Sequence, residues 1–304
     1  MRRIAAIDIG TVTMRLLIAD IDEQGIIREV LRDICLTHVG KNLTETGELH
    51  AEGMQRAFEA QERFAGSIAA HHVEQVIGVA TSATRDASNS DEFLWGLSAR
   101  GLDVHIIEGE REAALSFAGA TYGRSANDLL VIDPGGGSTE CVFAHDAGAK
   151  LQLRSLDIGS RRLTDMFMHE QRATSSEMDA TRVYVRRLFE PYFEQLDNEP
   201  AELVAVAGTA TSLVTIAQSM QEYDPARVHG QKMSIGEIDA IIEQLAQRTV
   251  EERKDIVGLE PKRASVILAG VIIIDEILKA TGLNSVTISD YDILYGIILS
   301  ADLF

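Results

Sequence analysis

Two segments of the chain share one pattern, in which an apolar run and an Asp lead into a turn with Gly and Ser or Thr, followed by a second apolar run. They are IAAIDIGTVTMRLLIAD, from Ile4 to Asp20, and LLVIDPGGGSTECVFAH, from Leu129 to His145. Short runs rich in Ile, Val and Leu are typical of buried strands, so each segment predicts a β-hairpin. Because the pattern occurs twice, it predicts two related lobes.

The turns of both hairpins have the chemistry of an anion site. Glycine lets the backbone approach an anion closely, and successive N–H groups in such a turn form an anion-binding concavity. Asp8 and Asp133 end the first strands, where a carboxylate is placed to hold a divalent cation. A glycine turn is also a common plain hairpin, but its repetition together with Asp and Ser or Thr favours phosphate binding. The predicted phosphate-binding residues of the two turns are Gly10, Thr11, Thr13, Gly135, Gly136, Gly137, Ser138 and Thr139.

Composition limits the class of protein. A length of 304 residues, with 45% hydrophobic and 25% charged residues, is that of an ordinary globular chain with two domains. The formal net charge of -19 argues against nucleic-acid and membrane-surface partners, which need clustered Lys and Arg. An anionic substrate must therefore be captured by a local site.

Cysteine usage and apolar runs indicate where the chain works. Cys35 and Cys141 have neither metal-site nor disulfide spacing, so we expect reduced thiols and a cytoplasmic location. Asp8 interrupts the first apolar stretch, which argues against a secretory signal. The apolar run 266–274 is too short to span a membrane, so we expect no membrane association.

The remaining pattern alternates strands with helices, which favours α/β lobes with largely parallel sheets and helices on their faces. Besides the hairpins, strands are expected over 26–36, 75–80, 103–107, 150–156, 202–208 and 285–289. Helices are expected over 50–71, 91–100, 161–168, 175–195, 235–247 and 262–281, with two more beginning near Gly109 and Asp290. The pattern restarts at Asp128, so the predicted lobes are 1–125 and 126–304.

A series of motifs resembles one known family. In chain order they are AAIDIGTVT, ATSATRDA, IIEGEREA, VIDPGGGSTE, GSRRLT, VAGTATSL, VHG and SDYDILYG. Their joint order, from Ile4 to about Gly296, is similar to that of the exopolyphosphatase and guanosine pentaphosphate phosphatase (Ppx/GppA) family. The resemblance implies a two-lobed, actin-like and sugar-kinase-like ATPase fold with duplicated ribonuclease H-like domains and an active site in the interdomain cleft. It also implies the short, two-domain form of the family, and a homodimer.

The resemblance assigns catalytic roles to two residues. Glu112, by its place in IIEGEREA, corresponds to the family's catalytic glutamate, which would orient or deprotonate the attacking water. Glu108 and Glu110 are local competitors, and acids are favoured at a helix N-terminus in any case. Arg85 matches the arginine of ATSATRDA and would grip the reacting phosphate bidentately.

Metal and further phosphate contacts follow from the same resemblance. Asp133 and Glu140, together with Asp8, would hold Mg²⁺, or Mn²⁺ in its place, directly or through water; a K⁺ requirement stays open. Arg162 in GSRRLT would add a phosphate contact. In GTATS, a predicted turn between a strand and a helix, the backbone could bind another phosphate at the helix N-terminus, although a plain N-cap also explains the pattern. The GTATS residues concerned are Gly208, Thr209 and Thr211.

The chain departs from the family pattern at a few positions. Val12 replaces the usual Asn of the first loop, and Leu294 and Tyr295 replace the Arg-Glu pair before the final Gly. Arg111 replaces a frequent Glu, and Pro134 replaces Ile or Leu, which removes one backbone donor. These changes leave open a reduced activity or an altered substrate preference.

Several functions are compatible with the pattern. The leading hypothesis is Mg²⁺-dependent hydrolysis of terminal phosphate from inorganic polyphosphate, with a preference for short chains because the extra domains of longer members are not represented. The second is hydrolysis of the 5′ γ-phosphate of guanosine pentaphosphate, which would use the same groups. A non-catalytic sensor of polyphosphate or alarmone is a third, and the Glu112 and Arg85 motifs argue against a kinase.

Overall fold

A computed structural model describes residues 1–304, which divide into two compact units. Unit 1 comprises Met1–Gly119 and Ile293–Phe304, and unit 2 comprises Ala120–Asp292. The expected boundary at 125 therefore falls a few residues late, and the expected second lobe wrongly includes the end of the chain. The reason is helix α13 (Ile293–Leu299), whose apolar residues are buried against strands β1 and β2.

Unit 1 is a five-stranded mixed sheet in the order β3-β2-β1-β4-β5. Neighbours β1, β2 and β3 are antiparallel, whereas β4 and β5 run parallel to β1. The strands are β1 (Arg2–Ile9), β2 (Thr13–Ile21), β3 (Ile27–Leu36), β4 (Gln75–Ala80) and β5 (Val104–Ile106). The other helices are α1 (Leu43–Thr46), α2 (Ala51–Ala70), α3 (Ser82–Asp86), α4 (Ser90–Ser98) and α5 (Gly109–Ala120), and the 3₁₀ turn η3 is Ala301–Leu303.

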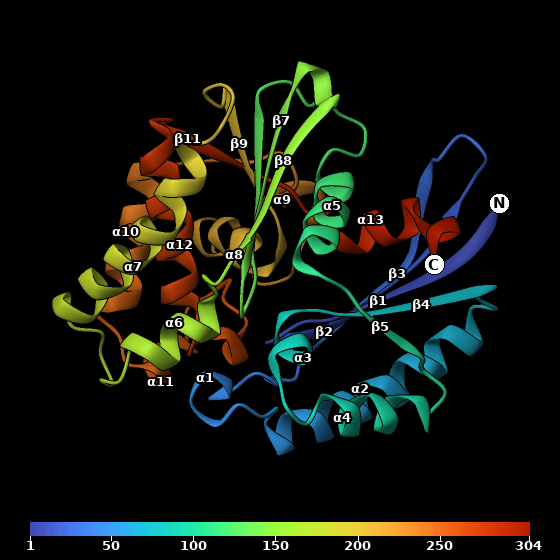
Figure 1. Ribbon diagram of the computed structural model, residues 1–304. Helices are drawn as coiled ribbons and strands as arrows, with labels where there is room; N and C mark the ends of the chain where they lie inside the picture. The colour runs from blue at the N-terminus through green and yellow to red at the C-terminus, as the bar shows by residue number, and fades with distance from the viewer. The chain divides into compact units, whose positions relative to one another are not determined.

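The core of unit 1 lies on one face of this sheet. Figure 1 shows α2 and α4 along that face, and Ile7 and Ile9 of β1 are buried in the cluster that includes Phe64 of α2 and Phe93 of α4. Because successive side chains of a strand point to opposite faces, Asp8 lies on the other face. Helix α13 packs on that face, and the Tyr295 hydroxyl donates to Glu29 Oε1 at 2.9 Å.

Unit 2 repeats this plan in the sheet order β10-β11-β9-β6-β7-β8. Counted from the β8 edge, the first four strands have the order and directions of β3-β2-β1-β4, so the expected duplicated α/β fold is confirmed. The strands are β6 (Leu129–Pro134), β7 (Thr139–His145), β8 (Lys150–Leu156), β9 (Glu202–Ala205), β10 (Lys232–Ser234) and β11 (Ser285–Ile288).

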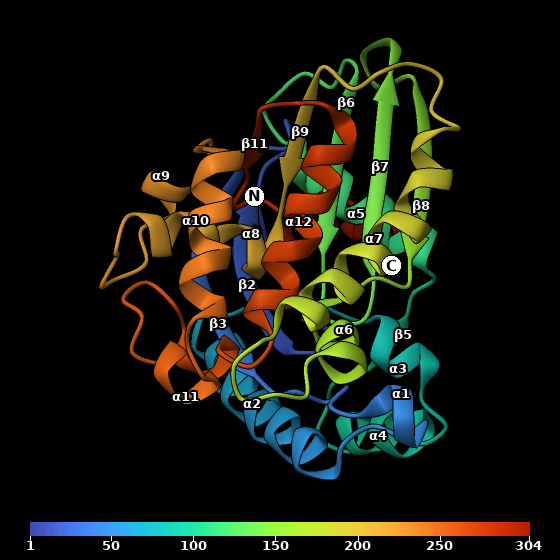
Figure 2. The ribbon, with the colours of Figure 1, turned by 90° about the vertical axis from the view of Figure 1, so that its left-hand side faces the viewer.

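Helices α7, α10 and α12 stack in front of this sheet in Figure 2, and they bury one core with Leu130 and Phe143 of the strands. The helices of unit 2 are α6 (Ser160–Phe167), α7 (Ser175–Phe193), α8 (Ala207–Ala217), α9 (Pro225–Val228), α10 (Ile235–Ala246), α11 (Val250–Arg253) and α12 (Ile267–Thr281). Two 3₁₀ turns, η1 (Asp146–Gly148) and η2 (Pro261–Arg263), complete the unit. None of the protein's helices has the length and apolar character that crossing a membrane requires.

Two expected elements have clearly different bounds: the helix expected from 262 begins at Ile267, and the second difference lies at GTATS. A strand was expected over 202–208, followed by a turn, but β9 ends at Ala205 and α8 begins at Ala207. Ala207, at the start of α8, adopts a left-handed backbone conformation with a φ of 64°. Thr209 and Thr211 are therefore helical residues, and the predicted turn is the first turn of α8.

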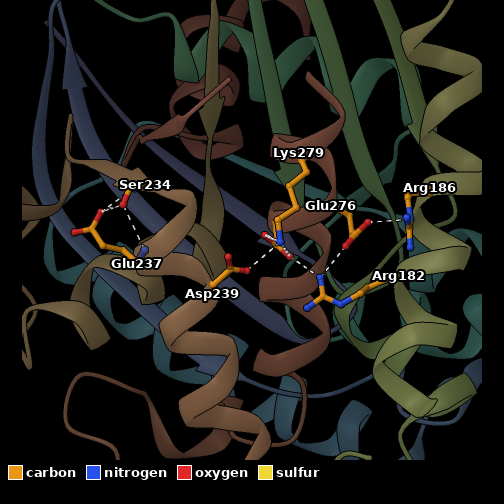
Figure 3. Close-up of polar contacts among 8 residues, drawn as sticks. Arg182, Arg186, Ser234, Glu237, Asp239, Glu276 and Lys279 are labelled. Atoms are coloured by element: carbon orange, nitrogen blue, oxygen red, sulfur yellow. Dashed lines mark hydrogen bonds and ion pairs between the residues drawn. The ribbon is translucent and has the colours of Figure 1, made fainter. Parts of the chain in front are cut away.

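An ion-pair network joins the helices of unit 2 (Figure 3). Asp275, fully buried on α12, binds Arg182 Nη1 of α7 at 2.6 Å and Lys279 Nζ at 2.8 Å. Lys279 also reaches Asp239 of α10 at 3.0 Å, and Glu276 binds Arg182 at 2.7 Å. Burial acts to lower the pKa of Arg182, but hydrogen bonds to Glu276 and Asp275 outweigh it and raise the pKa. The network thus stabilises one packing of α7, α10 and α12.

Replacing Asp275 tests this network. Asp275→Asn is expected to lower the free energy of unfolding by about 3 kcal/mol, because it removes a buried charge that compensates Arg182 and Lys279. Glu251→Gln is the control, since it breaks an exposed pair with Lys254 and should cost less than about 1 kcal/mol. Urea denaturation followed by circular dichroism measures both; equal small losses would contradict the assigned role of Asp275.

Candidate active site

The two predicted catalytic residues of unit 1 lie side by side. Arg85 stands in the last turn of α3, directly after β4, and Glu112 stands in the first turn of α5. Arg85 Nη1 lies 3.5 Å from Glu112 Oε2 and donates a hydrogen bond of 2.6 Å to the Ile107 carbonyl. The structure therefore brings together a guanidinium and a carboxylate that are distant in sequence.

Glu112 is buried, unlike the two neighbouring glutamates that could take the catalytic role. Only 8% of Glu112 is exposed, whereas Glu108 and Glu110 are both exposed to solvent. The backbone N–H of Glu112 donates to the Glu108 carbonyl at 2.9 Å, which ties its position to the start of α5. A buried carboxylate beside a cation is typical of a functional site, whereas an exposed acid at a helix N-terminus is commonly structural.

Close backbone packing holds the helix that carries Glu112. Gly296 of α13 lies so near α5 that a Cβ atom there would overlap the carbonyl oxygen of Leu115. Only glycine fits at this contact, which explains the final Gly of SDYDILYG. Leu294 and Tyr295, which precede this glycine, stand where the family pattern has Arg-Glu. The Leu294 side chain is buried, and the Tyr295 hydroxyl donates to Glu29.

The first predicted turn is tight and firmly anchored. The Gly10 N–H donates to the Thr13 carbonyl at 2.8 Å, and the Thr11 carbonyl accepts from the Gly40 N–H at 3.0 Å. Val12, which replaces the family's Asn, is buried, and its carbonyl accepts the N–H groups of Thr37 and His38. The side chain at position 12 is thus part of the packing of unit 1.

Asp8 has a strong partner that the sequence pattern did not single out. Arg15 lies directly opposite Asp8 in the β1–β2 register, and its Nε and Nη2 lie 3.0 and 2.7 Å from Asp8 Oδ2. Both side chains are largely buried. The sequence does contain one sign of this pairing, because Arg15 follows Asp8 at the same spacing at which Glu140 follows Asp133.

In unit 2 the start of α6 forms backbone hydrogen bonds to the glycine turn. The Gly135 N–H donates to the Ser138 carbonyl at 3.0 Å, and the Arg161 N–H donates to the Gly136 carbonyl at 2.8 Å. Arg162, a predicted phosphate contact, donates from Nε to the Gly137 carbonyl at 2.7 Å. This bond gives Arg162 a role in holding the turn; phosphate contact by Arg162 stays a prediction.

Two predicted residues on the strand that follows the turn, Thr139 and Glu140, have different surroundings. Thr139 is fully buried, and its hydroxyl donates to the Ile158 carbonyl, so this hydroxyl anchors the loop before α6. Glu140, only 2% exposed, lies directly opposite Asp133 across the β6–β7 pair. Since opposite residues of an antiparallel pair share one face, two carboxylates lie in one row on the sheet.

The start of α8 has a cationic neighbour that the sequence reasoning missed. The guanidinium of Arg263 lies against the Cα of Gly208, where any larger residue would overlap it. Thr211 donates its hydroxyl to the Gly208 carbonyl at 3.3 Å, and Thr209 packs against Gly270 of α12. Helix N-termini attract anions, and an arginine beside one strengthens that attraction. No sequence spacing connects Arg263 with GTATS, so only the fold reveals the pair.

The predicted metal ligands are shared between the units. Asp8 belongs to unit 1, whereas Asp133 and Glu140 belong to unit 2. Within neither unit do three or more His, Cys, Asp or Glu side chains come together as a metal-binding group. The set of Asp8, Asp133 and Glu140 stays a prediction.

The repeated sheet order and the two hairpins with an Asp near the turn define an α/β protein built from two copies of one plan. The chain belongs to the Ppx/GppA phosphatase family, whose model matches residues 17–303. This confirms the resemblance drawn from the motifs.

Individual relatives support the same assignment. Exopolyphosphatase 2 of Mycobacterium tuberculosis is 36% identical, with 98% of each chain covered. The crystal structure of an exopolyphosphatase from Cytophaga hutchinsonii is 26% identical and matches with a TM-score of 0.90, covering 99% of this chain and 97% of the other. The Ppx/GppA family member of Aquifex aeolicus is 30% identical, with a TM-score of 0.79 and coverage of 99% and 98%.

Gly296→Ala tests the packing behind Glu112. The added methyl group must push α13 and α5 apart, so we expect a loss of about 2 kcal/mol in stability and a lower rate of catalysis. Gly236→Ala in α10 is the matched control, because its Cβ meets open space and alanine should stabilise the helix by up to about 1 kcal/mol. Thermal unfolding measures both; a Gly296→Ala protein as stable and active as the wild type would contradict this packing.

Proposed function

We propose that this protein is a Mg²⁺-dependent exopolyphosphatase that releases orthophosphate from the end of inorganic polyphosphate, with short chains preferred. The single observation that carries the proposal is the buried Glu112 carboxylate beside the Arg85 guanidinium, 3.5 Å apart. The relative in Mycobacterium tuberculosis, named an exopolyphosphatase and similar over nearly its whole length, supports this choice of reaction.

In the proposed reaction Glu112 acts on water. A carboxylate can orient the attacking water and accept its proton, provided that it lies within hydrogen-bond reach of that water. Burial favours this role, because the exclusion of bulk water strengthens the electrostatic interactions inside a site. The oxygen of the water attacks the terminal phosphorus, and the bond to the bridging oxygen of the next phosphate breaks.

Arg85 is proposed to grip the phosphoryl group that is transferred. A guanidinium presents two parallel N–H donors that match phosphate oxygens. Its bond to the Ile107 carbonyl and its pairing with Glu112 hold the guanidinium where the water is activated. On phosphate binding, Arg85 would exchange part of its contact with Glu112 for the phosphate oxygens, which leaves Glu112 better able to accept a proton.

The donor set of unit 2 fits a divalent cation. Asp133 and Glu140 supply carboxylate oxygens, the ligands that Mg²⁺ prefers, from neighbouring strands. When bound, Mg²⁺ would offset the negative charge of the phosphates during transfer. Asp8 of unit 1 is proposed to contribute through water, since Arg15 already neutralises much of its charge.

The remaining polar groups are proposed to bind the rest of the substrate. The backbone of 136 and 137 is proposed to offer amides to one phosphate, since the Gly135 N–H already donates to Ser138, and the start of α8 with Arg263 is proposed to offer a second anion site. Because the net charge is -19, a long polyanion should be repelled elsewhere on the surface. The rate on polyphosphate should accordingly depend on ionic strength.

Glu112→Gln is the direct test. The amide cannot accept a proton, so phosphate release is expected to fall roughly a hundredfold or more. Glu110→Gln is the matched control, because Glu110 is exposed on the same helix and its loss should leave the rate unchanged. Phosphate release is measured on short-chain polyphosphate, long-chain polyphosphate and guanosine pentaphosphate in parallel.

The substrates separate the alternatives. Faster release from guanosine pentaphosphate than from either polyphosphate would replace the proposal by the second function of the family. Binding without turnover, equal in the wild type and in Glu112→Gln, would identify a sensor. An unchanged rate in Glu112→Gln would refute the role of Glu112.

Removal of the cation gives an independent test. Treatment with a chelator is expected to abolish phosphate release, and Mg²⁺ should restore it, whereas a monovalent salt at equal ionic strength should not. Full activity after thorough chelation, verified by metal analysis, would contradict the proposed requirement for Mg²⁺.

A further inference from the structure

A third polar residue continues the row of carboxylates in unit 2. Asp133 of β6 lies opposite Glu140 of β7, and Glu140 lies opposite Ser155 of β8. All three strands are antiparallel neighbours, so the three side chains lie on the same face of the sheet. This face is the one opposite the core of α7, α10 and α12, because the adjacent residues Ile132 and Cys141 belong to that core.

The hydroxyl of Ser155 makes a hydrogen bond within this row. Ser155 Oγ donates to Glu140 Oε1 at 2.7 Å, and Ser155 is only half-buried whereas Glu140 is 2% exposed. The strand order places Ser155 on the side of Glu140 away from Asp133. The bond therefore turns Oε1 toward β8.

The orientation of the Glu140 carboxylate matters because a second acid, Asp133, lies opposite it in the row. Like charges directly opposite each other on neighbouring strands repel. The corresponding row of unit 1 pairs Asp8 with Arg15, so there the protein itself supplies the opposite charge. In unit 2 the position of Arg15 is taken by Glu140, and the residue beyond it is a neutral hydrogen-bond donor.

We propose that Ser155 is a positioning residue, whose hydroxyl holds Glu140 in the orientation in which Glu140 and Asp133 bind a divalent cation. This inference rests on the proposed function for the identity of the cation. Ser155 touches neither water nor phosphate in this role and acts only through Glu140. Residues that hydrogen-bond to a metal-binding carboxylate typically tune metal affinity in this way.

The test measures cation binding and does not depend on turnover. The full-length wild type, Ser155→Ala and Ser155→Thr are titrated with Mn²⁺, and the unbound ion is followed by electron paramagnetic resonance. Ser155→Ala is expected to weaken Mn²⁺ binding about tenfold, the lower end for loss of such a partner. Ser155→Thr keeps the hydroxyl and should bind within about twofold of the wild type.

Ser98→Ala is the matched control. Ser98 donates to Asp103 at 2.8 Å on the surface of unit 1, so its loss removes a similar serine–carboxylate bond away from the site. The inference is overturned if the wild type binds no Mn²⁺, if Ser155→Ala binds it as tightly as the wild type, or if Ser155→Thr is as weak as Ser155→Ala. Failure of the wild type to release phosphate, with the expected pattern of Mn²⁺ affinities, would overturn the proposed function alone.

Discussion

The alternation of side chains along β1 and β6 is the constraint on which the site depends. In each unit one face of the sheet is covered by apolar helices, so the apolar residues of a strand must point to that face. Asp8 and Asp133 stand between those residues and are directed to the opposite face. A shift of register by one residue would bury either carboxylate in an apolar core, at a high cost in free energy.

The two units use one plan with different charges. In unit 1 the strand after the turn, β2, carries Arg15 opposite Asp8, and the two opposite charges offset each other. In unit 2 the strand after the turn, β7, carries Glu140 opposite Asp133. The row of Asp133, Glu140 and Ser155 therefore contains two acids and a hydroxyl donor. Equivalent strand positions thus carry an ion pair in unit 1 and two acids in unit 2.

Glycines and the ends of helices connect the fold to the site. Gly296 allows α13 to approach α5, and α5 carries Glu112. Gly208 leaves room for the guanidinium of Arg263 at the start of α8. In both places a motif glycine lies against a group from a distant part of the sequence. At Gly296 that group is backbone, so only glycine fits, whereas at Gly208 it is the end of a flexible arginine side chain.

Periodicity predicted most of the elements correctly. The expected strands at 75–80 and 150–156 coincide with β4 and β8, and the expected helix at 50–71 differs from α2 by one residue at each end. The failures are local and have physical reasons. The GTATS helix begins early because Ala207 adopts a left-handed conformation, which side-chain patterns do not reveal. Short helices such as α3 carry too few residues for a periodic signal.

The sequence by itself determined the two hairpins, the α/β class and the family, because these depend on residues adjacent along the chain. Only the tertiary structure decided which of three neighbouring glutamates is buried, and that Glu112 meets Arg85. It also decided that Arg15, Ser155 and Arg263 accompany the predicted residues. Such partners come together through strand register and helix packing, and among these three only Arg15 had a signal in the sequence, namely its spacing from Asp8.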